Sequence, residues 1–227
     1  MSQSRAILHT LPMNAISDRH ERAQELYSIL VALWPDQGPL LRYANCFELL
    51  VAVVLSAQCT DEQVNKATPA LFAAFPGPRE LALAPLEQVE ALVRTTGFYH
   101  HKAANIIAAA KLLVEEYEAT VPDSIEELVR LPGVGRKTAN LVVSACFGKP
   151  GIVVDTHVLR TARRLGIAPS DEANRSERMI AELLPEAQWT AFSFAINRLG
   201  KFFCKARKPL CADCPVRILC PSAYSFG

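Results

Sequence analysis

The spacing of the apolar residues is helical along almost the whole chain, and no other feature constrains the fold as strongly. Apolar side chains recur three or four residues apart, for example at Leu86, Val89, Leu92 and Val93, which places them on one face of a helix. Residues 152–154 (Ile-Val-Val) form the only run typical of a strand, and three residues cannot make a sheet. We therefore predict an all-α protein of about ten helices joined by short loops.

The ends of the helices are predicted from side chains that bond free backbone groups. In a capping box, a Ser or Thr begins the helix and a Glu or Gln follows three residues later. Asp155 is predicted to begin a further helix, and Gly166 to end it. The two capping boxes are Thr60 with Gln63 and Ser124 with Glu127.

The composition is that of a soluble globular protein. Of the 227 residues, 50% are hydrophobic and 21% are charged, which excludes a disordered chain. The longest apolar run, residues 49–55, is too short to span a bilayer, and no secretory signal precedes it. We therefore expect a cytoplasmic protein with no membrane partner. Residues 1–16 are expected to be a flexible tail, an interpretation favoured over a transit peptide. The net charge of +1 gives no sign of a nucleic-acid partner.

Four cysteines near the C-terminus are spaced C-x6-C-x2-C-x5-C. Four thiolates so close together can converge on one metal group. Structural zinc sites usually use two close pairs, whereas here only one pair is close, so a 4Fe–4S cluster is favoured over zinc or unligated thiols. We expect Phe202, Phe203 and Pro215 to pack around it. The candidate ligands are Cys204, Cys211, Cys214 and Cys220, and the other three cysteines, Cys46, Cys59 and Cys146, are expected to be small core residues.

The cysteine segment is also basic. Between residues 201 and 217 there are five Lys or Arg and one Asp, so 5 − 1 gives a local charge of +4. Some of these charges can compensate an anionic cluster, and a solvated basic loop is the simplest alternative. The interpretation with a function is a loop that the metal group orders against DNA phosphates. Its basic residues are Lys201, Lys205, Arg207, Lys208 and Arg217.

A glycine-containing turn joins two predicted helices at residues 131–140, which read LPGVGRKTAN. Gly133 and Gly135 permit unusual backbone angles and the close approach of another backbone. The N-terminus of the second helix is suited to binding one phosphate. Lys137 lies in its first turn, where the helix dipole and partial burial favour the neutral amine, a nucleophile that can form a Schiff base. The alternative is an ordinary surface lysine.

These motifs together resemble the endonuclease III family, bifunctional DNA glycosylase/AP lyases of the helix–hairpin–helix superfamily. The resemblance extends over about residues 20–222. It rests on LSAQCTD at 55–61, VNKA at 64–67, the hairpin at 131–140, VDTH at 154–157 and the cysteine tail, in that order.

The resemblance implies two helical lobes with a DNA-binding cleft between them. One lobe is a six-helix barrel, residues 39–149, with the helix–hairpin–helix motif at about residues 125–147. The other is an iron–sulfur cluster domain formed by residues 17–38 and 150–222. The implied partner is damaged double-stranded DNA, bound by a monomer located at the bacterial nucleoid.

The resemblance also implies the chemistry. Lys137 would attack the sugar of an oxidised pyrimidine nucleotide, and Asp155 would assist it. The Schiff base would then allow strand cleavage 3′ to the abasic site by β-elimination. Gln58 would fill the space of the flipped base and Phe98 would be a second wedge, although Phe98 on its own reads as a core aromatic at a helix junction. Further implied DNA contacts are Gly133, Gly135, Arg136, His157, Lys205, Arg207 and Lys208.

Three other functions compete with this interpretation. A monofunctional mismatch glycosylase shares the hairpin and the cluster but lacks a lysine at position 137. A non-catalytic protein that binds damaged DNA needs neither Lys137 nor Asp155. A redox sensor needs an accessible, labile cluster.

Two positions depart from the family pattern. Val129 stands where some family members carry a carboxylate, and Phe98 stands where the family usually has a smaller aliphatic residue.

Overall fold

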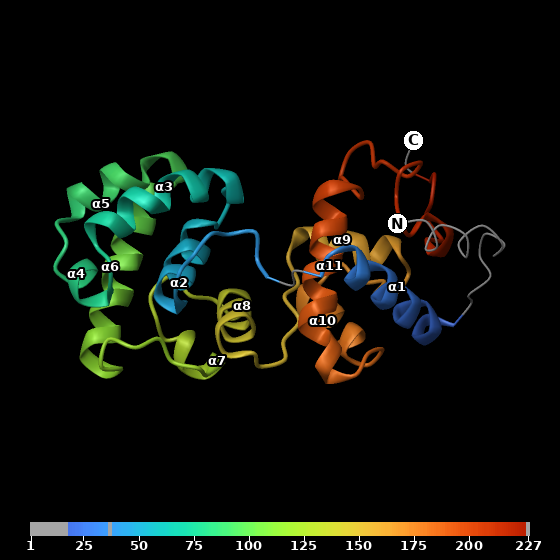
Figure 1. Cartoon of the computed structure of the whole chain (residues 1–227), viewed down its shortest axis with the longest axis horizontal. Helices are drawn as coiled ribbons and strands as arrows, with labels where there is room; N and C mark the ends of the chain where they lie inside the picture. The colour runs from blue at the N-terminus through green and yellow to red at the C-terminus, as the bar shows by residue number, and fades with distance from the viewer. Residues whose placement is uncertain (1–17, 36–37, 226–227) are drawn as a thin grey trace. The chain divides into compact units, whose positions relative to one another are not determined.

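The computed structural model describes residues 18–35 and 38–225, and the regular secondary structure in these ranges is entirely helical (Figure 1). No strand occurs within them, so the all-α prediction is confirmed. The predicted flexible tail, residues 1–16, lies outside the described residues. None of the helices in the described ranges has the length and apolarity needed to span a bilayer.

The chain divides into two compact units. The central unit is Pro39–Lys149, and the terminal unit joins the chain before it to the chain after it, up to Gly38 and from Pro150. The helices of the central unit are α2 (Cys46–Leu55), α3 (Asp61–Ala74), α4 (Pro78–Ala82), α5 (Leu86–Val93), η1 (Arg94–Thr96), α6 (Tyr99–Glu116), α7 (Ile125–Leu128) and α8 (Arg136–Phe147). Those of the terminal unit are α1 (Arg19–Leu33), α9 (Thr156–Arg164), α10 (Ala173–Ala181), η2 (Glu186–Gln188), α11 (Trp189–Phe202) and η3 (Arg217–Leu219).

Helix α2 forms the centre of the first core. Eight of its ten residues are buried, as expected for a helix that is apolar on all sides. It packs against α3, α6 and α8, so the helix that follows the glycine turn is held directly on the core. Cys46, Cys59 and Cys146, expected as core residues, are partly buried and pack against the edge of this core.

The second core forms around α11, which packs against α9 and α1. The contact between α9 and α11 depends on Gly200. A Cβ at this position would lie 2.9 Å from the Cβ of His157 and 3.0 Å from its carbonyl oxygen. A side chain of any size at position 200 would therefore push the two helices apart.

The strand-like run at residues 152–154 is buried but pairs with a helix instead of a sheet. The Ser193 hydroxyl accepts from Val153 N (2.8 Å) and donates to Val153 O (3.0 Å). Thr190 Oγ1, one turn earlier on α11, accepts from Gly151 N at 3.1 Å. Side chains of α11 thus bond the backbone groups that a neighbouring strand would otherwise bond.

The predicted helix ends agree with the structure. Thr60 accepts from Gln63 N, and Ser124 accepts from Glu127 N. Asp155 begins α9, and Gly166, with φ +70°, follows its end. Helix α7, which begins at the Ser124 cap, forms a single turn.

Candidate functional site

The two glycines of the hairpin have different roles. Gly133 has φ +80°, and a Cβ there would lie 3.0 Å from the Cβ of Asn105 on α6. Gly135 is the N-cap of α8 with φ −92°, and a Cβ there would meet nothing within 4 Å. Gly133 therefore adopts an unusual backbone angle of the kind that the sequence suggested, whereas Gly135 does not. The surface beside Gly135 is open.

Lys137 is the second residue of α8, immediately after the turn. The α8 N-terminus has no side-chain cap and no acidic residue in its first turn, so the positive end of the helix dipole is not compensated there. Lys137 and Arg136 are both exposed. The prediction that Lys137 is partly buried is wrong, because residues 135–137 lie on the outside of the turn while Val134 and Ala139 fill the core. The amine is directly accessible.

Asp155 is held by two hydrogen bonds from different elements. Its Oδ1 accepts from Val158 N at 2.8 Å, which caps α9, and its Oδ2 accepts from the side-chain amide of Asn197 at 2.8 Å. The carboxylate is half-buried, and these bonds fix its orientation. Asn197 lies on α11, 42 residues away, and no sequence pattern pointed to it.

His157 lies on the first turn of α9, beside Asp155. Burial lowers the pKa of its imidazole, and the positive charges of Arg160 and Lys201 lower it further, against the opposing effect of Asp155. Its Nδ1 lies 3.2 Å from Arg160 Nη2. His157 is therefore neutral near pH 7 and acts as a hydrogen-bonding group.

Gln58 and Phe98 are exposed residues on two turns of the central unit. Gln58 has φ +54° and Phe98 has φ +50°, in the left-handed region that residues other than glycine rarely adopt. Phe98 is 66% exposed, which excludes the alternative of a core aromatic. Val129, at the end of α7, is also exposed, at 42%.

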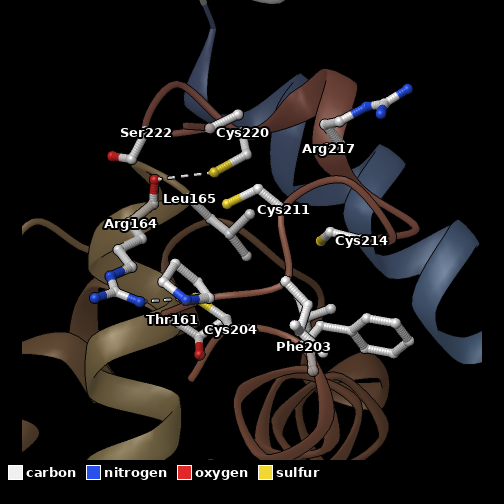
Figure 2. A pocket seen from close by; sticks show the side chains of 14 residues that line it. Thr161, Arg164, Leu165, Phe203, Cys204, Cys211, Cys214, Arg217, Cys220 and Ser222 are labelled. Atoms are coloured by element: carbon white, nitrogen blue, oxygen red, sulfur yellow. Dashed lines mark hydrogen bonds between the residues drawn. The ribbon is translucent and has the colours of Figure 1, made fainter. Parts of the chain in front are cut away.

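The four tail cysteines line one pocket (Figure 2). The pocket encloses about 420 Å³, part of it open to solvent. Burial raises the pKa of the Cys214 thiol to about 11 and also raises the pKa of Cys220. Burial therefore favours the neutral thiol at Cys214 and Cys220, and a positively charged group bound in the pocket would oppose this effect.

The donor set tests which metal group fits this pocket. Within residues 18–35 and 38–225, no three His, Cys, Asp or Glu side chains converge closely enough to share a single metal ion. Four cysteines spread around one cavity instead suit a group with several attachment points. Each iron at a corner of a 4Fe–4S cluster takes one thiolate, so four cysteines around one cavity fit such a cluster.

Arg164 connects the cysteine pocket to the basic loop. Its Nη1 donates to Cys204 Sγ (3.5 Å) and to Lys205 O (2.8 Å), and its Nη2 donates to Ala206 O (3.1 Å). Its own carbonyl accepts from Cys220 Sγ at 3.5 Å. Arg164 thus holds the loop backbone against the pocket from the end of α9, a role that the sequence did not indicate.

The aromatic surroundings of the pocket differ from the prediction. Phe203 lines it, together with Pro209 and Leu210. Phe202 and Pro215 do not line it. Phe202 is exposed, and its ring centroid lies 6.4 Å from that of Trp34.

Three of the basic residues extend into solvent. Lys205, Arg207 and Lys208 are exposed, whereas Lys201 is half-buried. Arg217 donates to Ala212 O and to the Tyr224 hydroxyl, both at 3.1 Å. Of the five basic residues, only Lys205, Arg207 and Lys208 therefore form an open cationic loop.

Known proteins resemble the chain in both sequence and structure. Residues 51–186 match the model of the HhH-GPD superfamily base excision DNA repair proteins. The chain is 45% identical to endonuclease III of Synechocystis sp. over 94% of its own length and 98% of that protein. It is 44% identical to endonuclease III of Bacillus subtilis, covering 83% of this chain and 86% of that one.

A solved structure described as a trapped endonuclease III–DNA covalent intermediate superposes with a TM-score of 0.85. It is 40% identical, and the match covers 91% of this chain and 97% of that one. A non-covalent endonuclease III–DNA complex gives a TM-score of 0.86 at the same identity and coverage. The chain therefore belongs to the HhH-GPD superfamily of base excision DNA repair proteins and, within it, to the endonuclease III family.

Proposed function

We propose that this protein removes oxidised pyrimidines from duplex DNA and then cleaves the strand 3′ to the abasic site. The observation that carries the proposal is Lys137, an exposed amine on the uncapped first turn of α8, directly after the hairpin. A monofunctional glycosylase or a binding protein has no use for an accessible nucleophile at this position. Family membership agrees with the bifunctional reaction.

Lys137 is the proposed nucleophile. Its neutral amine attacks C1′ of the damaged nucleotide, a C–N bond forms, and the base leaves with the electron pair of the glycosidic bond. The resulting Schiff base makes the C2′ proton acidic, and loss of that proton expels the 3′ phosphate by β-elimination.

Asp155 is the proposed carboxylate of the reaction. It assists deprotonation of the amine and stabilises the positive charge that develops on the sugar. The bonds from Val158 N and the Asn197 amide leave it little freedom to rotate, so its charge is preorganised for this role. His157, held neutral beside it, is a proposed hydrogen-bonding contact to the DNA.

The exposed turns of the central unit are the proposed DNA wedges. Flipping a base costs a few kcal/mol, and less for a poorly stacked lesion. Gln58 fills the vacated space, and the Phe98 ring inserts beside it. The hairpin, through Gly133, Gly135 and Arg136, binds one phosphate at the α8 N-terminus.

A 4Fe–4S cluster held by Cys204, Cys211, Cys214 and Cys220 is the proposed cofactor, with a structural role. When bound, it supplies four iron–thiolate bonds that cross-link the tail. Arg164 passes this order on to the basic loop through the carbonyls of Lys205 and Ala206. Lys205, Arg207 and Lys208 then meet DNA phosphates.

We further propose that residues 17–38 and 150–222 form the cluster domain and residues 39–149 the six-helix barrel. The protein acts as a monomer, since one chain supplies every proposed residue, and sedimentation equilibrium measures this. Its substrate places it at the nucleoid in the cytoplasm, which imaging of a fluorescent fusion tests.

Borohydride trapping tests the proposed reaction. The protein is incubated with a duplex that contains one thymine glycol, and the Schiff base is reduced. We expect a covalent complex with the wild type, none with Lys137→Ala, and an undiminished amount with Lys111→Ala, a matched exposed lysine on α6.

Other outcomes would identify the competing functions. Base release without a trapped complex would indicate a monofunctional glycosylase. Binding without base release would indicate a damage-binding protein or a different lesion. A duplex with a preformed abasic site separates these two, because the lyase acts on it without any base to remove.

A further inference from the structure

Lys102 is a buried lysine that none of the proposed chemistry uses. It lies near the start of α6, and its side chain is 5% exposed. Its ammonium donates to Thr96 O at 2.6 Å and to Leu55 O at 2.8 Å. Burial lowers the pKa of this amine, against the opposing effect of Cys59. Burying this ammonium removes its hydration, so its role is to be found in the two segments whose carbonyls it bonds.

The two carbonyls belong to the starts of the two proposed wedge turns. Leu55 is the last residue of α2, and the turn that carries Gln58 follows it. Thr96 is the last residue of η1, and Gly97 and Phe98 follow it. Leu55 and Thr96 are 96 − 55 = 41 positions apart in the sequence. The ammonium is therefore a direct bridge between them.

Both turns are strained, so they need external support. Gln58 and Phe98 hold positive φ angles while their side chains are exposed, and such conformations persist only where the surroundings enforce them. The remaining backbone support is local. Cys59 N donates to Ser56 O within the first turn, and Lys102 N donates to Phe98 O at the second.

Helix α6 also supports the hairpin. Asn105, one turn after Lys102, is the residue that a Cβ at Gly133 would approach to 3.0 Å. One helix thus contacts the hairpin through Asn105 and both wedge turns through Lys102. A displacement of this part of α6 would move all three proposed DNA-binding elements together.

We propose that Lys102 is a positioning residue for base flipping: by bonding Leu55 O and Thr96 O together, it sets the spacing at which the Gln58 and Phe98 wedges enter the duplex. This inference rests on the proposed function. It assigns Lys102 no contact with DNA, because the ammonium is buried and its donors are directed to the protein backbone.

The alternative is a purely structural lysine. An ammonium beside the last carbonyls of α2 stabilises the negative end of that helix dipole and requires no link to DNA. The two roles differ in what Lys102→Met changes. If Lys102 is purely structural, its substitution lowers only the fraction of folded protein. If it is a positioning residue, the substitution also lowers the activity of each folded molecule, because the two wedges are then misplaced.

A double-mutant cycle separates these roles. Single-turnover excision of thymine glycol is measured for the wild type, Lys102→Met, Gln58→Ala and the double variant, at a temperature where circular dichroism shows each to be folded. We expect Lys102→Met to lower the excision rate about tenfold. Gln58→Ala should lower the excision rate by a much smaller factor in the Lys102→Met background than in the wild type. Lys111→Met, on the exposed part of α6, is the matched control and should leave the rate unchanged.

A fluorescent base provides a readout that stability alone would not change. 2-Aminopurine placed next to the lesion brightens when a wedge unstacks it. Lys102→Met should bind the lesion duplex with a reduced brightening. The decrease in reaction rate caused by Lys102→Met should be smaller on a preformed abasic site than on thymine glycol, since no base has to be unstacked there.

The outcomes decide the proposal in either direction. Additive effects of Lys102→Met and Gln58→Ala, with normal brightening per bound protein, would overturn it and leave a structural lysine. If Lys102→Met does not accumulate as folded protein, Lys102→Gln, which keeps a donor but no charge, replaces it in the same cycle. A wild type that neither excises nor traps would instead overturn the proposed function.

Discussion

At the scale of single residues, the exposed turns hold conformations that oppose folding. Gln58 and Phe98 occupy the left-handed region, where a side chain costs about 1–3 kcal/mol relative to relaxed backbone. Glycine would relieve this strain, yet neither position has it. The structure thus retains two exposed side chains that destabilise it, which is expected where the side chains are needed to contact a ligand.

Replacing these residues by glycine separates stability from function. We expect Gln58→Gly and Phe98→Gly each to raise the free energy of unfolding by about 1 kcal/mol and to slow base excision. The corresponding alanine variants should slow excision equally without the gain in stability, because alanine keeps a Cβ at positive φ. Thermal denaturation and single-turnover excision measure the two effects. A glycine variant that is less stable than its alanine counterpart would contradict the strain argument.

His157 gives the stability a dependence on pH. Its pKa in the folded protein is lowered, chiefly by burial, so the unfolded chain binds a proton at a higher pH than the folded one does. Stability therefore falls as the pH drops below about 6.5, and the loss ends below the folded-state pKa. We expect the midpoint of urea unfolding to change less between pH 7 and pH 5 in His157→Asn than in the wild type. An unchanged slope in that variant would assign the dependence to another group.

At the scale of elements, the hairpin is fixed to α6 on one side and open on the other. Gly133 meets Asn105, whereas nothing lies within 4 Å of a Cβ at Gly135. The fold therefore requires the first glycine, and only an external ligand can require the second. This difference makes the hairpin testable with two neighbouring substitutions.

Gly133→Ala and Gly135→Ser should have opposite consequences. Alanine at 133 combines positive φ with a close contact, and we expect a loss of about 2 kcal/mol in stability. Serine is a good N-cap, so Gly135→Ser should keep the melting temperature while its side chain obstructs the phosphate and weakens DNA binding. Differential scanning fluorimetry and fluorescence anisotropy measure these effects. Undiminished DNA affinity in Gly135→Ser would remove the hairpin from the DNA interface.

At the scale of the whole molecule, non-local contacts separate what the sequence predicted from what it did not. Helices and caps were predictable because the groups that make them lie within four residues of one another. The support of Asp155 by Asn197, and of the wedge turns by Lys102, joins residues 42 and 47 apart, and such bonds leave no periodic pattern. The exposure of Phe98 agrees with the wedge that the family resemblance implies, whereas hydropathy alone favours burial of an aromatic ring.

The cysteine pocket and the basic loop should respond together to loss of the proposed cluster. Removing the cluster should weaken binding to every duplex, because Lys205, Arg207 and Lys208 lose their ordered backbone. In the intact protein, substituting each by alanine should reduce the slope of log K against log salt by about one. Anisotropy titrations between low and high salt measure the slope. Full affinity in iron-free protein would contradict the structural role, and unchanged slopes would return these residues to a solvated loop.

The contact between α11 and residues 151–155 has a consequence for how the chain can vary. Thr190, Ser193 and Asn197 lie three and four residues apart on one face of α11, and they bond Gly151, Val153 and Asp155, which alternate along the extended segment. An extended pair of residues advances about 6.6 Å and a helical turn about 5.4 Å, so the two spacings stay matched over this short length. Substitutions that keep the polar groups can therefore accumulate here over evolutionary time. A single insertion or deletion in either segment would move Asp155 out of register with Asn197, so this stretch can drift in composition but not in length.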